Sequence, residues 1–277
     1  MRQLIVSLTT TSKRLHFCRT ALISLTTQSI LPKRIIINVS KEPYLRDEGI
    51  KDNSVLSILT SGIPKDLKEI IELRWVKNTG PYRKLIPTLQ QADDNDIIIT
   101  ADDDIFYDHD WLKLLVDDFE PDNKIIHAGR VRRRRKNCFG QYTGYIYWPI
   151  IKNKEILKDD WIITYGGGAV LCRDWFSNEL IGDSSYLDIA PTADDLWYSK
   201  LCQNSGLKVK VIPEVLTQLN FIQHNDGLTN HNFPNPKGRI SKVKYLFFDR
   251  PLNYFRIINF GNDIAYNSIE KHFSNRT

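Results

Sequence analysis

The stretch Asp96-Ile97-Ile98-Ile99-Thr100-Ala101-Asp102-Asp103-Asp104 joins a β-branched run to three adjacent carboxylates. Its first five residues predict a strand buried on both faces, because continuous apolar runs are typical of parallel sheets that helices cover on both sides. The aspartates then lie at the carboxyl end of that strand, the edge at which open α/β sheets bind their ligands. Adjacent carboxylates repel one another, and a divalent cation bound together with substrate phosphates relieves that repulsion. The stretch therefore predicts a metal and phosphate site at the edge of a sheet, with a solvated acidic turn as the alternative.

The segments that precede this stretch alternate between strands and helices. Short apolar runs predict strands over residues 4–8, 34–39 and 71–76. Apolar residues at helical spacing predict a helix over residues 12–29 with Ser12 as its N-cap. Pro81 fits the first turn of a second helix that runs to about Gln91. Strands that alternate with helices in this way predict an open α/β sheet.

The second half of the chain has a more mixed pattern. Strands are predicted over residues 145–151, 169–171 and 208–212. The glycine-rich residues 165–168 predict a loop of close backbone approach, and a helix is predicted over residues 192–205, ended by Gly206. Because no repeat and no clear linker separates two units, we expect one continuous domain with a loop-rich extension over residues 216–277.

The composition is that of a globular protein. The chain has 277 residues, enough to bury a core as one large domain or two small ones. Its 42% hydrophobic and 26% charged residues exclude collagen-like, coiled-coil and largely disordered chains. No apolar run approaches the roughly 20 residues of a membrane span, and the N-terminus lacks a signal-peptide pattern. We therefore expect a cytoplasmic protein, with peripheral contact at the inner face of the cell membrane as an option.

The cysteines do not form a metal or redox motif. Cys18, Cys138, Cys172 and Cys202 lie at least 30 residues apart, without a CxxC pair. Zinc clusters and redox motifs need closer spacing. Buried free thiols in a reducing compartment are the expectation.

The net charge of +5 is unevenly distributed. Residues 130–136 (Arg130 to Lys136) carry +6 and residues 233–277 carry +5, which indicates an anionic partner. Residues 130–136 match no nucleic-acid motif, so nucleic acid is disfavoured, whereas a solvated or membrane-facing loop and contact with an anionic acceptor stay open. The aromatic residues 245–248 and 254–258 suit docking on an anionic bilayer or packing of a helix on the domain.

Three further features combine charge with turn chemistry. Asp194 and Asp195 either occupy the first turn of a helix, where the helix dipole favours acids, or supply a general base. A helix that begins within residues 80–87 would aim its N–H groups at an anion and bring Lys84 or its neighbour Arg83 against a phosphate, unless the segment is an ordinary turn. His224 is either a metal or phosphate contact or a polar surface residue.

Together these motifs resemble a GT-A-fold glycosyltransferase, broadly of family 2, from about residue 3 to 215. In the order of that family, they are Val6–Thr10 with Lys13 and Arg14, residues 31–38, residues 80–87, the DXD motif 102–104, the glycine-rich segment 165–171 and the late acidic motif 192–197. The resemblance implies an α/β fold, with a mostly parallel sheet flanked by helices. It divides the chain into a nucleotide-binding half over about 1–130, an acceptor half over about 131–215, and the extension 216–277, which is part of the same domain or associated with membrane or acceptor.

The resemblance also implies an activity. It is that of a hexosyltransferase, which moves a sugar from a nucleotide-sugar donor, preferably a UDP-sugar, to a saccharide or lipid-linked saccharide with inversion at the anomeric carbon. The implied cofactor is Mn²⁺ or Mg²⁺. The setting that it suggests is the synthesis of a bacterial surface polysaccharide, such as a capsule or a lipooligosaccharide.

The motifs and the resemblance assign roles to particular residues. The expected metal ligands are Asp104, Asp102 and His224. The expected nucleotide and donor contacts are Ser7, Thr9, Arg14, Lys84, Asp102 and Asp103. The expected contacts of donor sugar and acceptor are Gly166, Gly167, Gly168 and Trp197. Asp195 is the preferred base, with Asp194 as the second choice.

Two other function classes remain. A non-catalytic protein could bind a membrane or polyanion through its basic patch, but the aspartates at the sheet edge would repel a polyanion there. A nucleotidyltransferase would share the nucleotide loop and the metal carboxylates, with a glycine-rich, basic first loop. That loop is Ser7-Leu8-Thr9-Thr10-Thr11-Ser12 in this chain, without glycine.

Overall fold

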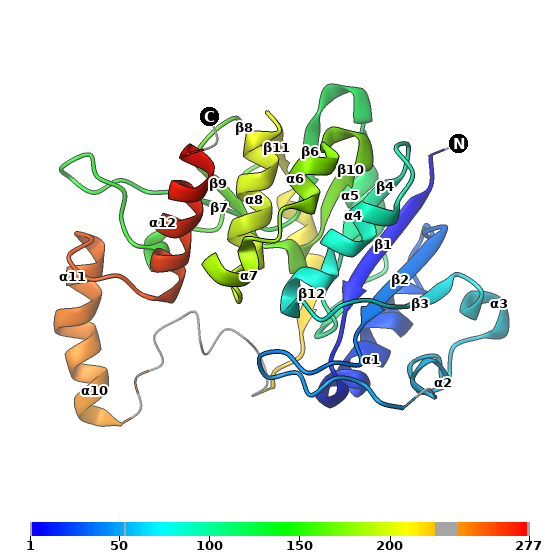
Figure 1. Cartoon of the computed structure of the whole chain (residues 1–277). Helices are drawn as coiled ribbons and strands as arrows, with labels where there is room; N and C mark the ends of the chain where they lie inside the picture. The colour runs from blue at the N-terminus through cyan, green and yellow to red at the C-terminus, as the bar shows by residue number, and fades with distance from the viewer. Residues whose placement is uncertain (1, 53, 225–235, 237, 276–277) are drawn as a thin grey trace.

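The computed structural model describes residues 2–52, 54–224, 236 and 238–275. Its centre is an eight-stranded sheet with the order β3-β2-β1-β4-β10-β6-β11-β8 (Figure 1). The strands are β1 (Leu4–Thr9), β2 (Arg34–Val39), β3 (Ile71–Trp75), β4 (Ile97–Thr100), β6 (Ile125–Ala128), β8 (Ile156–Leu157), β10 (Ala169–Cys172) and β11 (Lys208–Val211). The strand predicted over residues 34–39 is confirmed with the same bounds, and the other apolar runs of the first hundred residues form strands within two residues of their predicted ends.

The direction of the strands brings the loops of the site together. β1 pairs in parallel with β2 and β4, and β2 pairs in parallel with β3, so that their carboxyl ends share one edge. β10 runs antiparallel between β4 and β6, with Val170 opposite Ile99. The loop before β10 therefore lies at the edge where the aspartates follow β4. Since β6 and β11 are again parallel, the predicted α/β fold with a mostly parallel sheet is confirmed.

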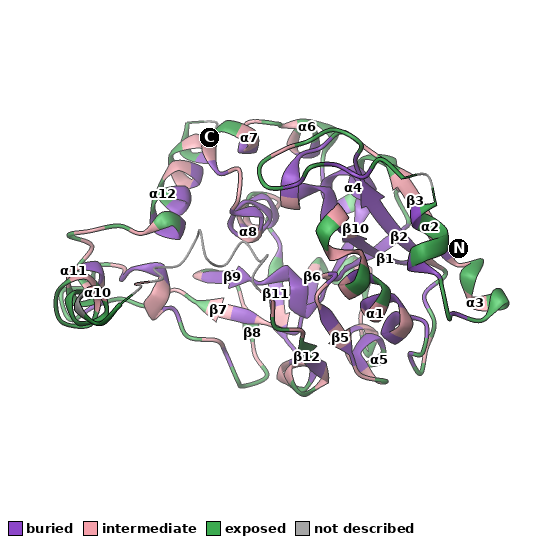
Figure 2. Cartoon of the chain, turned by 90° about the horizontal axis from the view of Figure 1, so that it is seen from below, coloured by how far each residue is buried: buried purple, intermediate pink, exposed green. Residues whose placement is uncertain are grey.

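Helices cover both faces of the sheet, as the continuous apolar strands require. α4 (Ile86–Gln91), α6 (Asn178–Gly182) and α8 (Asp194–Asn204) lie on one face, and α1 (Leu15–Leu25) and α5 (Trp111–Val116) lie on the other (Figure 2). Two small antiparallel ribbons flank the sheet. They are β5 (Ile105–Tyr107) with β12 (Leu219–Phe221), and β7 (Val131–Arg133) with β9 (Trp161–Ile163). The remaining short helices are α2 (Val55–Leu59), α3 (Lys65–Lys68) and α7 (Tyr186–Ile189).

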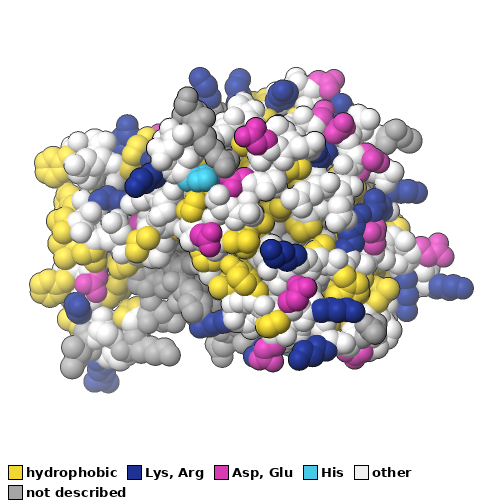
Figure 3. All heavy atoms as spheres, viewed as in Figure 1, with side chains coloured by type: hydrophobic (Ala, Val, Ile, Leu, Met, Phe, Trp, Pro, Cys, Tyr) yellow, Lys and Arg dark blue, Asp and Glu magenta, His cyan; other side chains and the backbone are white. Residues whose placement is uncertain are grey.

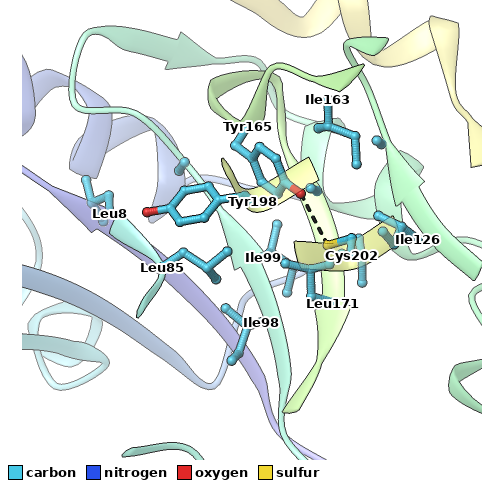
Figure 4. Packing of buried hydrophobic residues seen from close by; sticks show 14 of the residues in the cluster. Leu8, Leu85, Ile98, Ile99, Ile126, Ile163, Tyr165, Leu171, Tyr198 and Cys202 are labelled. Carbon is cyan, nitrogen blue, oxygen red and sulfur yellow. Dashed lines mark hydrogen bonds between the residues drawn. The ribbon is translucent and has the colours of Figure 1, made fainter. Parts of the chain in front are cut away.

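The core joins the central strands to α8. Ile98, Ile99 and Leu171 of the central strands are fully buried, and Tyr198 of α8 belongs to the same cluster (Figure 4). The hydroxyl of Tyr165 lies 3.4 Å from the Cys202 sulfur, which links the loop before β10 to the same helix (Figure 4). This packing fixes the start of α8, and with it the predicted base, against the sheet edge.

Some local predictions are wrong. The helix predicted over residues 12–29 begins only at Leu15, because Ser12–Arg14 form a tighter 3₁₀ turn, so Ser12 is not its N-cap. The helix predicted from Pro81 is likewise split into a 3₁₀ turn, Gly80–Lys84, and α4. Both turns bring a basic side chain, Arg14 or Lys84, onto the aspartates.

The strand predicted over residues 145–151 is also wrong, because this aromatic segment packs on the C-terminal helices. Tyr145–Tyr147 form a 3₁₀ turn, in which the Tyr145 N–H donates to Asp263 Oδ1 at 2.7 Å. Of the four cysteines, Cys138 is exposed, so burial is confirmed only for the other three.

The C-terminal extension over residues 216–277 contains β12 and, from Arg239 onward, a series of helices, while most of the predicted Pro/Asn/Gly loop lies outside the described residues. α10 (Arg239–Lys244), a π-helical turn (Tyr245–Asp249), α11 (Arg250–Tyr254) and α12 (Gly261–Ser274) follow one another. α12 packs on α8 through Trp197 and Phe273, whose ring centroids are 5.0 Å apart. α10 and α11 stand away from the sheet (Figure 1), and apolar side chains gather at that end of the molecule (Figure 3). None of the described helices is long and apolar enough to cross a membrane.

Candidate functional site

A cavity of about 940 Å³ opens at the carboxyl edge of β1 and β4. Its wall combines the loop after β1, the Gly80–Lys84 turn, the three aspartates and the start of α8. Arg130, Arg132, Tyr145, Phe221 and Asn262 form a further part of the wall. The topology thus collects in one cavity groups that lie as far apart in the chain as Thr9 and Asn262.

The chain supplies its own cations to the three aspartates. The Arg14 guanidinium pairs with Asp103 and, at 2.8 Å, with Asp104 Oδ2. Lys84 Nζ lies 2.6 Å from Asp102 Oδ1. The repulsion within the triplet is therefore relieved by Arg14 and Lys84, and the charge of the triplet does not by itself require a metal, contrary to the argument from sequence.

Asp102 lies against Gly166 of the loop before β10. The Asp102 backbone N–H donates to the Tyr107 hydroxyl at 2.7 Å, and that hydroxyl donates to the Gly166 carbonyl at 2.9 Å. A Cβ atom on Gly166 would lie 2.0 Å from Asp102 Oδ2. The glycine-rich segment therefore lets the carboxylate approach the backbone of the loop before β10.

Lys84 joins the aspartate triplet to α8. Besides Asp102, its Nζ lies 3.4 Å from Asp194 Oδ2. Burial opposes the charge of Lys84, but the carboxylates of Asp102, Asp194 and Asp195 outweigh it and raise the pKa of Lys84 well above its usual value. Lys84 is therefore a permanent cation at the centre of the cavity wall.

Asp195 differs from Asp194 in its partners. The Asp195 carboxylate accepts a hydrogen bond from the Tyr165 backbone N–H at 3.0 Å. Burial, reinforced by the charge of Asp194, raises the pKa of Asp195 to about 7. Burial also raises the pKa of Asp194, but the Asp194 carboxylate is engaged with Lys84. Of the pair, Asp195 is thus the group suited to take up a proton near neutral pH.

Two of the three predicted metal ligands meet. Asp104 Oδ2 lies 2.8 Å from His224 Nε2, whereas Asp102 is turned toward Lys84. Among residues 2–52, 54–224, 236 and 238–275, no group of three acidic, histidine or cysteine side chains could hold a metal alone. Asp104 and His224 are thus two candidate ligands, and a divalent cation at this place would need further ligands from a bound substrate.

The other predicted site residues differ in their position relative to the cavity. The Ser7 hydroxyl donates to the Lys84 carbonyl at 2.6 Å and is fully buried, so that Ser7 positions Lys84. Thr9 and Asp103 line the cavity. Gly167 and Gly168 pack on Arg130 and Trp111, and Trp197 packs on α12, so none of the three belongs to the cavity wall of the described chain.

Several residues of the wall lie in segments where the sequence shows no motif. Asp47 forms a buried ion pair with Arg83 at 2.8 Å, which holds the Gly80–Lys84 turn in place. Tyr145, Phe221 and Asn262 come from segments without a motif. For Arg130 and Arg132 the sequence did offer a signal, because alternate residues of the run 130–136 share one side if the run forms a strand.

Residues 47–179, just under half of the chain, match the family model "Glycosyl transferase family 2". The match confirms the resemblance drawn from the motifs, and it spans the DXD triplet and the glycine-rich segment. No curated protein matches the sequence significantly.

Three solved structures are similar to the chain only at a distance. A 4-diphosphocytidyl-2C-methyl-D-erythritol synthase has a TM-score of 0.44 and 8% identity over 75% of this chain and 86% of its own. The synthase from Anaerococcus prevotii DSM 20548 has a TM-score of 0.44 and 12% identity over 76% and 88%. The 2-C-methyl-D-erythritol 4-phosphate cytidylyltransferase of Francisella tularensis has a TM-score of 0.43 and 9% identity over 75% and 88%. Likeness at this level carries no conclusion about activity.

Proposed function

From the family 2 match, which supports glycosyl transfer as the activity, we propose that this cavity transfers a sugar from a nucleotide-sugar donor to a saccharide acceptor. The observation that carries the proposal is the position of Lys84, a buried cation between Asp102 of the DXD motif and Asp194 beside the base. We further propose a UDP-sugar as donor, a saccharide or lipid-linked saccharide as acceptor, and inversion at the anomeric carbon.

The leaving diphosphate needs positive charge. Negative charge grows on it as the glycosidic bond breaks, and fixed cations in a water-poor site stabilise such charge effectively. Lys84 and Arg14 provide these cations from the chain. A divalent ion held by Asp104 and His224, Mn²⁺ or Mg²⁺, would add Lewis-acid stabilisation of the same group.

The acceptor hydroxyl needs a base. Asp195 lines the cavity, and its pKa of about 7 allows it to be ionised and still basic enough to take a proton. The Tyr165 N–H holds the carboxylate in place. In-line attack by the deprotonated hydroxyl in a single displacement inverts the anomeric carbon, and Asp194 acts by positioning Lys84.

Thermal unfolding with a panel of nucleotides tests the proposal. A ligand at 100 times its Kd adds about 2.7 kcal/mol, which shifts the midpoint by several degrees at about 2–4 °C per kcal/mol. We expect a shift with UDP that increases with Mn²⁺. A shift with CMP or GDP instead would overturn the choice of donor, and no shift with any nucleotide would contradict a nucleotide-sugar transferase.

Replacing Gly166 by alanine is expected to weaken UDP binding by about tenfold or more, equivalent to about 1.4 kcal/mol. The new Cβ would lie 2.0 Å from Asp102 Oδ2, and the displaced carboxylate would leave Lys84. Calorimetric titration with UDP measures the effect. The matched control is Gly182→Ala, where no atom lies within 4 Å of the added Cβ. Equal binding by both variants would show that Asp102 is not needed at this position.

The peripheral membrane contact predicted for residues 130–136 and the C-terminal tail stays a prediction. The exposed Phe247 and Phe248 between α10 and α11, with basic Lys244 and Arg250 nearby, support it. The run 130–136 supports it less than expected, because Arg130 and Arg132 line the cavity. Binding to anionic vesicles is the measurement that decides.

A further inference from the structure

Two arginines line the cavity without a carboxylate partner. Arg130 directly precedes β7 and Arg132 lies within it, and both side chains line the cavity. Within the described chain, neither guanidinium lies within 4.0 Å of a carboxylate. Of the other three arginines of the cavity wall, Arg14 pairs with Asp104, Arg83 pairs with Asp47, and Arg46 is exposed to solvent.

The surroundings hold these two side chains without neutralising them. Arg130 lies over the Phe221 ring at 5.4 Å, and Arg132 lies over the Tyr145 ring at 5.3 Å. One arm of Arg132 donates to the Trp148 carbonyl at 2.7 Å, while its buried Nε has no hydrogen-bond partner in the described chain. Burial, and then the like charge of Arg132, lower the pKa of Arg130. Half-buried like charges oppose one another unless an anion joins them.

The pair is tied to the residue that holds the base. Thr164 donates to the Arg130 carbonyl through both its backbone N–H, at 2.9 Å, and its hydroxyl, at 3.0 Å. The next residue, Tyr165, holds the Asp195 carboxylate. The arginines and the base therefore have fixed relative positions in one cavity, while the carboxylates of the DXD triplet are already paired with Arg14 and Lys84.

We propose that Arg130 and Arg132 form an anion subsite of the acceptor, so that the acceptor carries a carboxylate or phosphate near the hydroxyl that is glycosylated. This inference rests on the proposed function and names the acceptor class, an acidic saccharide such as a uronate or a sugar phosphate. Guanidinium groups suit such anions because their paired N–H donors match carboxylate and phosphate oxygens.

Binding of methyl glucuronide, glucose 6-phosphate and methyl glucoside in the presence of UDP and Mn²⁺ tests the subsite. We expect the wild-type protein to bind at least one acidic sugar about tenfold or more tightly than the neutral glucoside. The two acidic sugars separate carboxylate from phosphate recognition. Arg130→Gln and Arg132→Gln are expected to abolish the preference. Arg135→Gln, which removes the same charge from an exposed residue of the same run, is expected to retain it.

Three results would overturn the inference. The first is equal or absent binding of all three sugars by the wild-type protein. The second is an unchanged preference for acidic sugars in both Arg130→Gln and Arg132→Gln. The third is loss of the UDP-induced shift in melting temperature in these variants, which would show that the two arginines bind the donor. A UDP shift without a preference for acidic sugars would refute the subsite and leave the proposed function standing. Absence of any nucleotide shift would instead refute the function. Arg130→Gln is also expected to keep or raise the ligand-free melting temperature, since it removes the repulsion from Arg132.

Discussion

Asp195→Asn lowers kcat/KM for glycosyl transfer by about 10²–10⁴-fold, the usual contribution of a general base, and leaves UDP affinity unchanged. The asparagine oxygen can still accept the hydrogen bond from the Tyr165 N–H, so the geometry of the cavity is retained while the proton acceptor is lost. Steady-state kinetics with the identified donor and acceptor measure the change. Asp188→Asn, an exposed acid on α7, is the matched control.

The pH profile gives this prediction a second readout. Because the pKa of Asp195 is about 7, wild-type kcat/KM is expected to rise with pH and to level off above that value, whereas the residual activity of Asp195→Asn lacks this limb. Activity within about tenfold of wild type, or an unchanged limb in the variant, would show that another group takes the proton.

The same pKa shift has a consequence for stability. The folded protein holds a proton on Asp195 up to about pH 7, while the unfolded chain releases it near 3.8, so the folded state binds more protons in that window. The contribution of this group to stability therefore falls as pH rises from about 4 to 7. Asp195→Asn removes the effect and is expected to gain on the order of a few kcal/mol relative to wild type between pH 5 and pH 8. Urea unfolding at the two pH values measures it.

Lys84→Met is expected to lower kcat by about 10²–10³-fold, the loss typical of one electrostatic donor in an active site. The variant also leaves Asp102 and Asp194 without the cation that separates them. Breaking a buried pair by removing one partner costs about 3–5 kcal/mol, so the free energy of unfolding falls as well. Kinetics and denaturant unfolding measure the two effects separately.

A double variant distinguishes catalysis from folding. Lys84→Met with Asp194→Asn removes both charges, so we expect it to recover most of the lost stability while its activity stays low. Lys33→Met, on the exposed surface, controls for the loss of a charge. Recovery of activity in the double variant would show that Lys84 only supports the fold.

The sequence predicted those features that depend on neighbouring residues. A continuous apolar run such as Ile97–Thr100 predicts a strand that is buried on both faces, and this prediction does not depend on which helices cover it. The strand and the position of the aspartates at its carboxyl end therefore followed from the pattern. Lys84 and Arg14 were expected near a donor phosphate, and the structure places both on the aspartates. The roles of all these residues in catalysis stay predictions.

Features that depend on contacts between residues distant in the chain could not be predicted from the sequence. Tyr145 turns away from a strand because Asp263 binds its N–H, and no local pattern encodes that partner. The run 130–136 reads as one basic surface until β7 separates alternate residues, which sends Arg132 into the cavity and leaves Arg133 outside with Glu155. The strand propensity of these residues predicts neither the turn at Tyr145 nor the side of β7 that faces the cavity.

The antiparallel insertion of β10 also sets an order of events during synthesis. When β4 leaves the ribosome it can pair with β1, but its other edge, a run of three isoleucines, stays open until residues 169–172 arrive. An open apolar edge is a template for aggregation. The strand that closes this edge also delivers the Tyr165 loop that holds Asp195. A chain that closes the open edge of β4 has therefore, by the same step, placed the loop on which Asp195 is later held.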